Sequence, residues 1–330
     1  MKTRLYQNIP VEGFEDQDPS RIYQDPIRKD SRFWNEGKWE NFIAPLLSKN
    51  VTDSTFVEMG CNAGLFLKLA EDYGFRNVVG IEKNTTPVKY GLKYRDSIGY
   101  HYKLLKRCLG GRNGENGSFD IDELPVADYT IMSTFHYYIG INSWIKYLDR
   151  LKSKTRYVLI VSRPSMRKEN WRAHSSHERL KEYFADWEEI GVVNDVSKEG
   201  DPAPRDLFSV LFKSPVLERV ALKDIDTSWI KVHPLYVAMK DLAEQAKDND
   251  NLDPFTTDYY EKYLQNKEGK WKVGTTRRYV LSKFNMMMDI KENGIRDPII
   301  LNQANEILDG GHRLSILEAF DYESVIVRRA

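Results

Sequence analysis

Apolar residues recur along the chain in two spacings, which predict alternating strands and helices over roughly the first two thirds of its length. Runs typical of buried strands occupy residues 54–59, 77–82, 129–134 and 156–162, and apolar residues at helical spacing lie around 34–50, 65–73, 142–152 and 176–187. Two more strand candidates, 188–196 and 207–214, follow one another directly. Alternation that ends in two consecutive strands predicts an α/β sheet with an antiparallel final hairpin.

The same pattern divides the chain into three parts. Residues 1–30 are polar and dotted with prolines, which favours an extended arm. Beyond Pro215 the apolar runs are shorter, and the strand candidates PIIL, EIL and SVIVRR stand out with one helix that ends near Gly294. We therefore expect an arm over 1–30, an α/β domain over 31–216 and a smaller α+β domain over 217–330.

Composition narrows the class of protein. Lysine and arginine number 49, as do aspartate and glutamate, so the 330-residue chain has no net charge and is not expected to be held by nucleic-acid phosphates. Its two cysteines form neither a disulfide framework nor a zinc-finger spacing. The apolar runs are too short for a membrane span, and the N-terminus lacks the apolar core of a signal peptide. These features predict a cytoplasmic protein without a membrane or nucleic-acid partner, and they do not indicate its oligomeric state.

A glycine-rich turn, VEMGCNAG, joins the first predicted strand to the helix that follows. Gly60 and Gly64 let the backbone approach a ligand, and the helix start directs N–H groups toward it. Glu82 ends the next strand, 24 residues after Glu58, where a carboxylate can accept hydrogen bonds from both hydroxyls of a ribose. The alternative is a tight turn with an unrelated surface glutamate. Strand, helix, second acid and final hairpin together favour a cofactor site.

The turn differs from the G-x-G-x-x-G of NAD-binding folds, since Asn62 stands at the middle glycine. In this turn and in the final hairpin the chain resembles class I S-adenosylmethionine-dependent methyltransferases. The resemblance implies a Rossmann-like seven-stranded sheet and S-adenosyl-L-methionine as cofactor. It further implies that Gly60 and Gly64 line the cofactor with Asn62 between them, that Glu58 lies beneath its amino-acid end, and that Glu82 holds its ribose.

The resemblance covers about residues 33–214 and includes FDIDELPVADYTIMSTFH, where an acid precedes a Leu-Pro pair and a further strand. It implies that Asp120 or Asp122 approaches the adenine amine, and the choice between the two stays open. The strand expected just before Asp120 is replaced by GGRNGENGS. We therefore expect the third strand to be displaced or short.

Two histidines are candidates for the base that methyl transfer to a hydroxyl requires. His136 follows the fourth strand at the edge where such sheets bind ligands, although a packing role at a helix start is the equal alternative. His177 follows Ser175, which with Glu178 forms a capping-box pattern, and the dipole of the helix disfavours an imidazolium in its first turn. His174 and His177 have no third ligand at matching spacing, so we expect no metal site.

The loop RPSMRKENWRAHSSH follows the fifth strand and is rich in basic residues. Arg163, Trp171 and Arg172 are candidates for binding the acceptor, since guanidinium groups bind anions and an aromatic ring can stack on a sugar. The alternative is an ordinary solvated loop. The Asp-Pro-Pro-Tyr and Pro-Cys signatures of familiar DNA methyltransferases are absent from the sequence. We expect O-methylation of a glycan or of a small polar acceptor, phosphorylated or not.

The stretch EILDGGHRLSILEAF joins a short strand to a helix near the C-terminus. Gly310 and Gly311 leave N–H groups accessible at an electropositive helix start, and Arg313 can form a fork with a phosphate. With Asp309 and His312 they form a candidate phosphate or nucleotide site. The alternative is a tight turn that only caps a helix.

The segment 290–329 around this turn resembles the ParB/sulfiredoxin-like fold, in which an Asp-Gly-x-His-Arg turn opens a helix. The match extends back to the strand VALKDI, with residues 228–275 as an insertion. It implies binding of ATP or CTP, with or without phosphoryl transfer, and the turn lacks the cysteine of sulfiredoxins. The alternatives are a degenerate domain that helps to bind substrate or a subunit, recruitment of a nucleic acid for methylation, and a cofactor-binding protein without catalysis.

Overall fold

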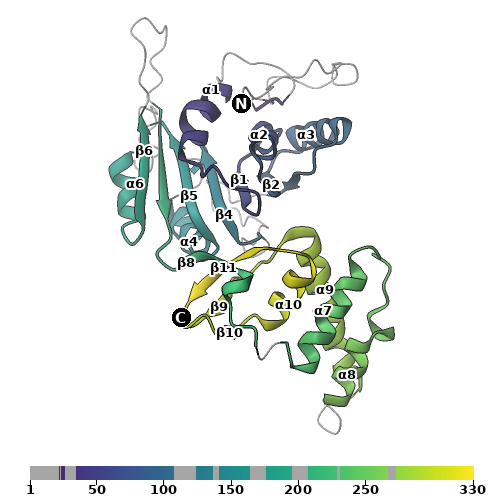
Figure 1. The fold of residues 1–330 in the computed structure, drawn as a ribbon. Helices are drawn as coiled ribbons and strands as arrows, with labels where there is room; N and C mark the ends of the chain where they lie inside the picture. The colour runs from purple at the N-terminus through teal and green to yellow at the C-terminus, as the bar shows by residue number, and fades with distance from the viewer. Residues whose placement is uncertain are drawn as a thin grey trace, which may run out of the picture. The chain divides into compact units, whose positions relative to one another are not determined.

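The structure is a computed structural model, and it describes residues 22, 24–26, 35–107, 124–136, 141–163, 176–194, 207–228, 231–266 and 273–330. The chain forms two compact units, traced in Figure 1. The first holds residues 1–123 and 127–215, and the second holds residues 124–126 and 216–330.

Seven strands form the sheet of the first unit, in the order β3-β2-β1-β4-β5-β7-β6. They are β1 Thr55–Met59, β2 Asn77–Glu82, β3 Lys103–Lys106, β4 Ala127–Ser133, β5 Thr155–Ser162, β6 Glu188–Asn194 and β7 Phe208–Lys213. The strands from β3 to β5 pair in parallel, and β7 is antiparallel to both of its neighbours. The predicted Rossmann-like sheet with an antiparallel final hairpin is therefore confirmed.

The third strand is both short and displaced. It spans only Lys103–Lys106 and pairs with β2 from Val79 to Glu82, well ahead of the position that would directly precede Asp120. The chain from 108 to 123, which includes GGRNGENGS, lies outside the described residues. The sequence offers only Leu104 and Leu105 as apolar residues in this strand, which is why no apolar run marks it.

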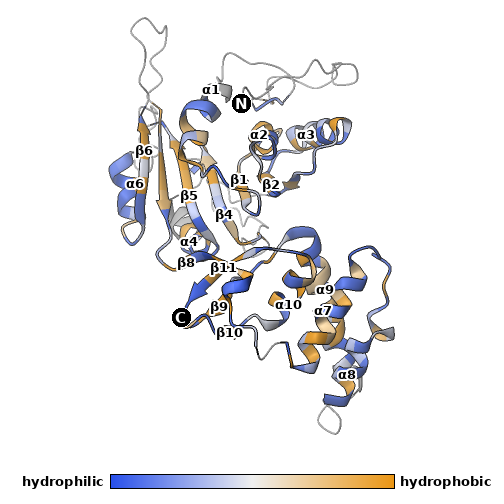
Figure 2. Ribbon diagram, viewed as in Figure 1, coloured by the Kyte–Doolittle hydropathy of each residue, from blue (hydrophilic) through white to orange (hydrophobic). Residues whose placement is uncertain are grey.

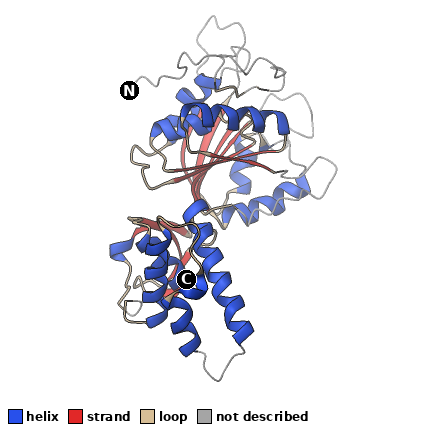
Figure 3. Ribbon diagram, turned by 90° about the vertical axis from the view of Figure 1, so that its right-hand side faces the viewer, coloured by secondary structure: helices blue, strands red, loops and turns tan. Residues whose placement is uncertain are grey.

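Helices lie on both sides of the sheet (Figure 3). They are α1 Asn35–Lys38, the π-helix η2 Trp39–Ile43, the 3-10 helix η3 Ala44–Leu46, α2 Leu65–Tyr73, α3 Thr85–Ile98, α4 Ile141–Lys152 and α6 His177–Tyr183. One face of the sheet is covered by an apolar cluster that includes Trp39, Phe42, Phe56, Phe66, Tyr129 and Leu211. On the other face, Tyr147 of α4 donates to Met59 Sδ at 3.1 Å, and the rings of Phe184 and Phe212 stack at 4.5 Å.

The amphipathic segment around 34–50 was expected to be one helix, and this expectation is wrong in detail. The chain passes from α-helix through one turn of π-helix to a 3-10 turn that includes Pro45. The change lets Trp39, Phe42 and Ile43 all become buried against the sheet. Apolar spacing alone does not distinguish these three helical forms.

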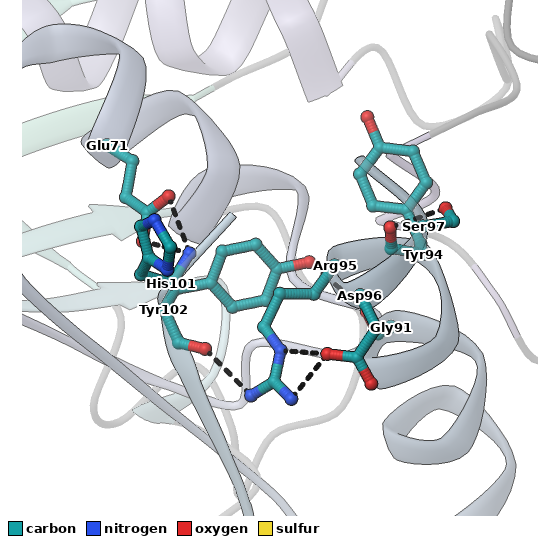
Figure 4. Close-up of polar contacts among 8 residues, drawn as sticks. All are labelled: Glu71, Gly91, Tyr94, Arg95, Asp96, Ser97, His101 and Tyr102. Carbon is teal, nitrogen blue, oxygen red and sulfur yellow. Dashed lines mark hydrogen bonds and ion pairs between the residues drawn. The ribbon is translucent and has the colours of Figure 1, made fainter. Parts of the chain in front are cut away.

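Polar contacts tie the edge strand β3 to α2 and α3 (Figure 4). Arg95 Nη1 donates to the carbonyl oxygen of Tyr102 at 3.2 Å, and the backbone N–H of His101 donates to Glu71 at 3.0 Å. The buried hydroxyl of Tyr102 donates to the carbonyl oxygen of Gly91 at 3.2 Å. These bonds hold the residues directly before β3 against α2 and α3.

The second unit is a four-stranded sheet with helices. Its strands are β8 Leu217–Ala221, β9 Ile299–Leu301, β10 Ile307–Asp309 and β11 Ser324–Arg329, in the order β10-β9-β11-β8. Its helices are η6 Leu222–Asp224, α7 Pro234–Ala246, η7 Pro254–Thr256, α8 Asp258–Asn266, α9 Val273–Asn293 and α10 Gly311–Ala319. Only β9 and β11 pair in parallel, so the unit is α+β as expected.

The stretch 228–275, read from the sequence as an insertion, supplies part of the core of this unit. Buried side chains from α7 and α8 belong to the same apolar cluster as the strands, and the cluster includes Leu235, Met239, Tyr259, Val280, Leu301, Leu314 and Val327. The apolar colouring of the helices in Figure 2 follows this packing. Helices that share one core with the sheet are expected to fold together with it.

Gly91→Ala should destabilise the protein by about 1–3 kcal/mol, the usual effect of overpacking. A Cβ at Gly91 would lie 2.5 Å from the carbonyl oxygen of Ala63, a backbone atom that cannot rotate away. Gly274→Ala is the matched control, since a Cβ there meets nothing within 4 Å. Urea denaturation should find the control neutral or stabilised by up to about 1 kcal/mol. Equal effects of the two substitutions would contradict the close packing of α3 on the turn.

Candidate functional site

The candidate site of the first unit lies where the strand order reverses. Strand β1 is flanked by β2 and β4, so successive strands lead away from it in opposite directions. Ligands of open α/β sheets bind in the crevice at the carboxyl ends of the strands at such a point. The turn after β1, the end of β2, the turn after β4 and the end of β5 all lie at this edge, because these strands are parallel.

The turn after β1 has the left-handed backbone that glycine favours. Gly60 has φ +75° and Gly64 has φ +86°, and Gly64 precedes the first residue of α2. A Cβ built on Gly60 would lie 2.4 Å from the ring of Phe135, so only glycine fits between this ring and the turn. Asn62 also has positive φ, +49°, which asparagine tolerates better than most residues. The two glycines therefore stand where the sequence predicted a close backbone approach.

Glu82 is tied to this turn by its carboxylate. Its Oε2 accepts the backbone N–H of Asn62 at 3.2 Å. Its Oε1 accepts the backbone and side-chain N–H groups of Asn84 at 2.8 and 2.7 Å. Each carboxylate oxygen has more than one acceptor direction, so hydroxyl donors can still be accepted. Glu82 thus fixes the turn and presents a negative charge at the carboxyl end of β2.

Glu58 is fully buried in β1 and is held from an unexpected direction. The side-chain N–H of Gln24, in the N-terminal arm, donates to Glu58 Oε1 at 3.1 Å. Burial raises the pKa of the Glu58 carboxyl to about 8, and nearby Glu82 adds to this while Gln24 and Lys38 oppose it. Its Oε2 has no hydrogen-bond partner among the described residues. A buried acceptor without a donor is a strong reason to expect a ligand here.

The turn after β4 is strained and brings two side chains to the site. Thr134 is β-branched yet has φ +52°, a conformation such residues rarely adopt. The next residue, Phe135, lies against Gly60. His136 is fully buried, and its Nε2 lies 3.3 Å from the hydroxyl of Ser162 at the end of β5. His136 is therefore at the carboxyl edge of the sheet, one strand away from β1.

His177 lies elsewhere in the unit. It is the first residue of α6, and its Nε2 is 2.8 Å from Glu189 of β6, the outermost strand. Its side chain is about one third exposed. The predicted helix start is correct, but the cap is wrong by one residue, because the hydroxyl of Ser176, not Ser175, accepts the N–H of Arg179 at 3.2 Å. No described contact brings His177 to His136 or to the turn after β1.

The other predicted residues of the first unit are only partly described. Arg163 directly follows β5, and its Nε is buried without a hydrogen-bond partner among the described residues. Asp120, Asp122, Trp171 and Arg172 lie outside the described residues. Of the three predicted acceptor-binding residues, the structure thus describes Arg163, at the carboxyl edge of the sheet.

The turn DGGHR in the second unit is as predicted in its backbone. Gly310 has φ +103° between β10 and α10, and the N–H groups of the next three residues precede the first helical hydrogen bond, from Leu314 to Gly310. Arg313 is already engaged, since it pairs with Asp309 at 2.7 Å and donates to the carbonyl oxygen of Asp297 at 2.8 Å. The turn therefore stabilises itself through its arginine.

His312 in this turn is neutral at physiological pH. Its Nε2 lies 3.2 Å from the hydroxyl of Tyr259. Burial lowers the pKa of its imidazole to about 4, with smaller contributions from Lys283 and His233. The histidine can exchange a hydrogen bond with a ligand, but it does not bring a positive charge to an anion.

A cavity of about 780 Å³ opens beside this turn. All five residues of the turn line it, from Asp309 to Arg313, as do the charged residues Lys283, Asp289, Arg296 and Asp297 and the apolar residues Tyr236, Met286 and Leu308. Arg296 pairs with Asp289 at 2.5 Å. The volume lies within the range of small-molecule sites.

Sequence reasoning missed several residues of these sites. Gln24 stands in a segment without periodic apolar residues, and the sequence around it does not indicate a contact with β1. Phe135 could have been noticed, because it stands next to His136 at the carboxyl end of a strand. Lys283 and Arg296 reach the cavity from α9 and from the turn after it, which only the packing of the unit reveals.

The residues that the structure describes lack two features, a membrane-spanning helix and a metal-binding cluster. No helix among them is long and apolar enough to cross a membrane. Within the same ranges, no three His, Cys, Asp or Glu side chains gather in a way that could hold a metal ion.

Comparison with known proteins gives only distant likenesses. No family model matches the sequence, and no curated protein matches it. Among solved structures, the chain is similar to TehB from Haemophilus influenzae, with 13% identity and a TM-score of 0.38 over 49% of this chain and 57% of that one. It is also similar to a SAM-dependent methyltransferase from Aquifex aeolicus, with 15% identity and a TM-score of 0.39 over 57% and 100% of the two chains. The N-methyltransferase NodS from Bradyrhizobium japonicum is a third, with 15% identity and a TM-score of 0.43 over 56% and 98%. The chain therefore spans little more than half the length of TehB, and a functional conclusion has to rest on its own residues.

The buried carboxyl of Glu58 predicts a specific dependence of stability on pH. Its pKa in the folded, unliganded protein is about 8, above its ordinary value of 4.5. Between these values the unfolded chain is ionised while the folded one holds the proton, so stability falls as pH rises through this window, by roughly 1.4 kcal/mol per pH unit. Glu58→Gln should therefore stabilise the protein at pH 8.5 and have little effect at pH 4.5.

Urea denaturation of ligand-free protein at the two pH values measures this effect. Glu40→Gln, which removes an exposed carboxylate from η2, controls for the loss of one charge. The same change in stability from Glu58→Gln at both pH values would show that the carboxyl is not held protonated.

Proposed function

We propose that the first unit binds S-adenosyl-L-methionine and transfers its methyl group. The observation that carries this proposal is the meeting of a glycine turn with two buried carboxyl groups, Glu58 and Glu82, at the switch point of the sheet. An antiparallel β7 beside β5 supports it, since the class I methyltransferase resemblance implied this hairpin.

The residues of the turn fit this cofactor in shape and in charge. Gly60 and Gly64 take the left-handed backbone that turns the chain from β1 into α2, and this brings the N–H groups at the start of α2 to the carboxyl edge of the sheet. Glu82 has acceptor capacity for ribose hydroxyls, and Glu58 has an unpartnered oxygen that suits a cationic amino-acid end. When bound, the cofactor supplies an electrophilic methyl group on a sulfonium sulfur. Asp120 or Asp122 is proposed to accept the adenine amine.

The acceptor is proposed to be a glycan or a small polar molecule, phosphorylated or not, that is methylated on oxygen. His136 is proposed to take the hydroxyl proton, because it lies at the end of β4, and Ser162 can hold its ring in one orientation. His177, paired with Glu189, is the second candidate for the base. The unpartnered Nε of Arg163 supports an anionic acceptor, with Trp171 and Arg172 as proposed neighbours.

A second proposed function concerns the second unit, whose turn at residues 309–313 resembles that of the ParB/sulfiredoxin-like fold. We infer that its cavity binds a nucleotide, ATP or CTP. The observation in favour is a space of about 780 Å³ lined both by the N–H groups at the start of α10 and by Lys283 and Arg296. Because Arg313 is engaged by Asp309, the charge for the phosphates is proposed to come from Lys283. Phosphoryl transfer is a further step that would need a separate assay.

Native mass spectrometry and calorimetry test the first proposal. The purified protein should carry or bind S-adenosylhomocysteine. Gly60→Ala should weaken this binding at least about tenfold, since its Cβ would overlap the ring of Phe135. Gly99→Ala is the control, because Gly99 has a similar φ of +72° at the end of α3 and nothing within 4 Å of its Cβ position. Failure of the unaltered protein to bind S-adenosylhomocysteine would end the proposal.

Calorimetry with ATP and CTP, each with and without Mg²⁺, tests the second proposal. Lys283→Ala should weaken binding of the preferred nucleotide by about tenfold, the usual effect of removing a charge-assisted hydrogen bond. Lys223→Ala removes an exposed lysine that does not line the cavity and should have no effect. If the unaltered protein binds neither nucleotide, the turn is a helix cap and the nucleotide proposal is wrong.

A further inference from the structure

In the N-terminal arm, the described residues Ile22, Gln24 and Asp25 contact the turn after β1 and α3. Ile22 is buried in a cluster with Ala63, Tyr90 and Tyr94, which belong to this turn and to α3. The hydroxyl of Tyr90 donates to the buried carboxylate of Asp25 at 3.0 Å. An apolar contact and a buried hydrogen bond therefore hold the arm on either side of Gln24.

Gln24 itself is 2% exposed and is bound both to the candidate cofactor turn, at Asn62, and to the strand before it, at Glu58. Its backbone N–H donates to Asn62 Oδ1 at 3.2 Å, and its side-chain N–H donates to Glu58 Oε1 at 3.1 Å. Polar groups buried on folding must find hydrogen-bond partners, so a glutamine here carries an energetic penalty if it is only a filler.

The hydrogen bonds around Gln24 leave two acceptors unmatched. Gln24 Oε1 and Glu58 Oε2 are both buried, and neither has a donor among the described residues. Each belongs to a group that shares the Gln24–Glu58 hydrogen bond, in which Gln24 Nε2 and Glu58 Oε1 lie 3.1 Å apart. When Glu58 is ionised both oxygens are acceptors, and a ligand that brings several N–H donors and a positive charge would match them. An α-ammonium group meets both requirements.

We propose that Gln24 is a binding residue for the amino-acid end of the cofactor, in which its Oε1 and Glu58 Oε2 accept hydrogen bonds from the α-ammonium group. This inference rests on the proposed cofactor and assigns a residue outside the glycine turn to it. Burial holds the proton on Glu58 in the unliganded protein, and an arriving ammonium favours its release. The arm thus contributes directly to affinity for the amino-acid end, and not for the nucleoside.

The test compares two ligands that differ only at this end. S-Adenosylhomocysteine carries the amino-acid group, whereas 5′-methylthioadenosine ends at a methyl group on sulfur. Gln24→Leu, which removes the amide and shortens the side chain by one heavy atom, should weaken binding of S-adenosylhomocysteine at least about tenfold by calorimetry and should change binding of 5′-methylthioadenosine by less than about twofold. Gln245→Leu, the same change at an exposed position of α7, should alter neither affinity. Gln24→Asn serves in its place if the leucine variant does not fold.

The outcomes separate this inference from the proposed function. If the unaltered protein binds neither ligand, the cofactor proposal fails and this inference with it. If it binds both and Gln24→Leu weakens neither, Gln24 is not a binding residue. Equal weakening of both ligands would mean that the arm acts through general packing of the turn, which also overturns the inference. Loss confined to S-adenosylhomocysteine supports it.

Discussion

The burial of the Glu58 carboxyl in the central strand is the constraint on which the site of the first unit depends. A carboxyl group removed from water must be protonated, paired or hydrogen-bonded, and here burial dominates its environment. The neighbouring groups are arranged around this requirement. Gln24 bonds one oxygen of Glu58, and Asn62 binds Gln24 through its side chain and Glu82 through its backbone. Gln24, the two acids and the turn therefore form one hydrogen-bonded assembly.

Much of the fold could be predicted from the sequence, because buried parallel strands are continuous apolar runs and their order follows from the alternation with helices. Strand β3 could not, since it is an edge strand of four residues with polar ends. The π-helix at Trp39 and the helix cap at Ser176 could not be predicted from the sequence either, because each depends on which of two adjacent hydrogen bonds forms in the packed structure. Such local choices are decided by tertiary contacts that periodicity does not contain.

The candidate site likewise has residues that the sequence could predict and residues that it could not. Glu58, Gly60 and Gly64 stand close together in the sequence, so a local motif contains their geometry. Gln24 is separated from Glu58 by 34 positions and lies in a segment without periodicity, and only the folded arm brings the two together. For Arg313 the sequence gives the residue type but not its contacts. Its residue type suits a phosphate, but the nearby carboxylate of Asp309 and the carbonyl oxygen of Asp297 occupy its guanidinium. Residue type indicates a capacity, and packing determines whether that capacity is free.

The choice between the two candidate bases follows from the same geometry. A base must reach the acceptor hydroxyl within a hydrogen bond, so it has to lie near the switch point. His136 stands at the end of β4, directly beside β1, and Phe135 next to it touches Gly60. His177 is paired to Glu189 on β6, four strands from β1, which at the spacing of neighbouring strands is roughly 19 Å. The contact with Glu189 holds the His177 ring at β6, out of reach of an acceptor at the switch point. His136 is therefore the better candidate. The strained turn at Thr134 places Phe135 against Gly60, and the His136 ring lies 3.3 Å from the hydroxyl of Ser162 at the end of β5.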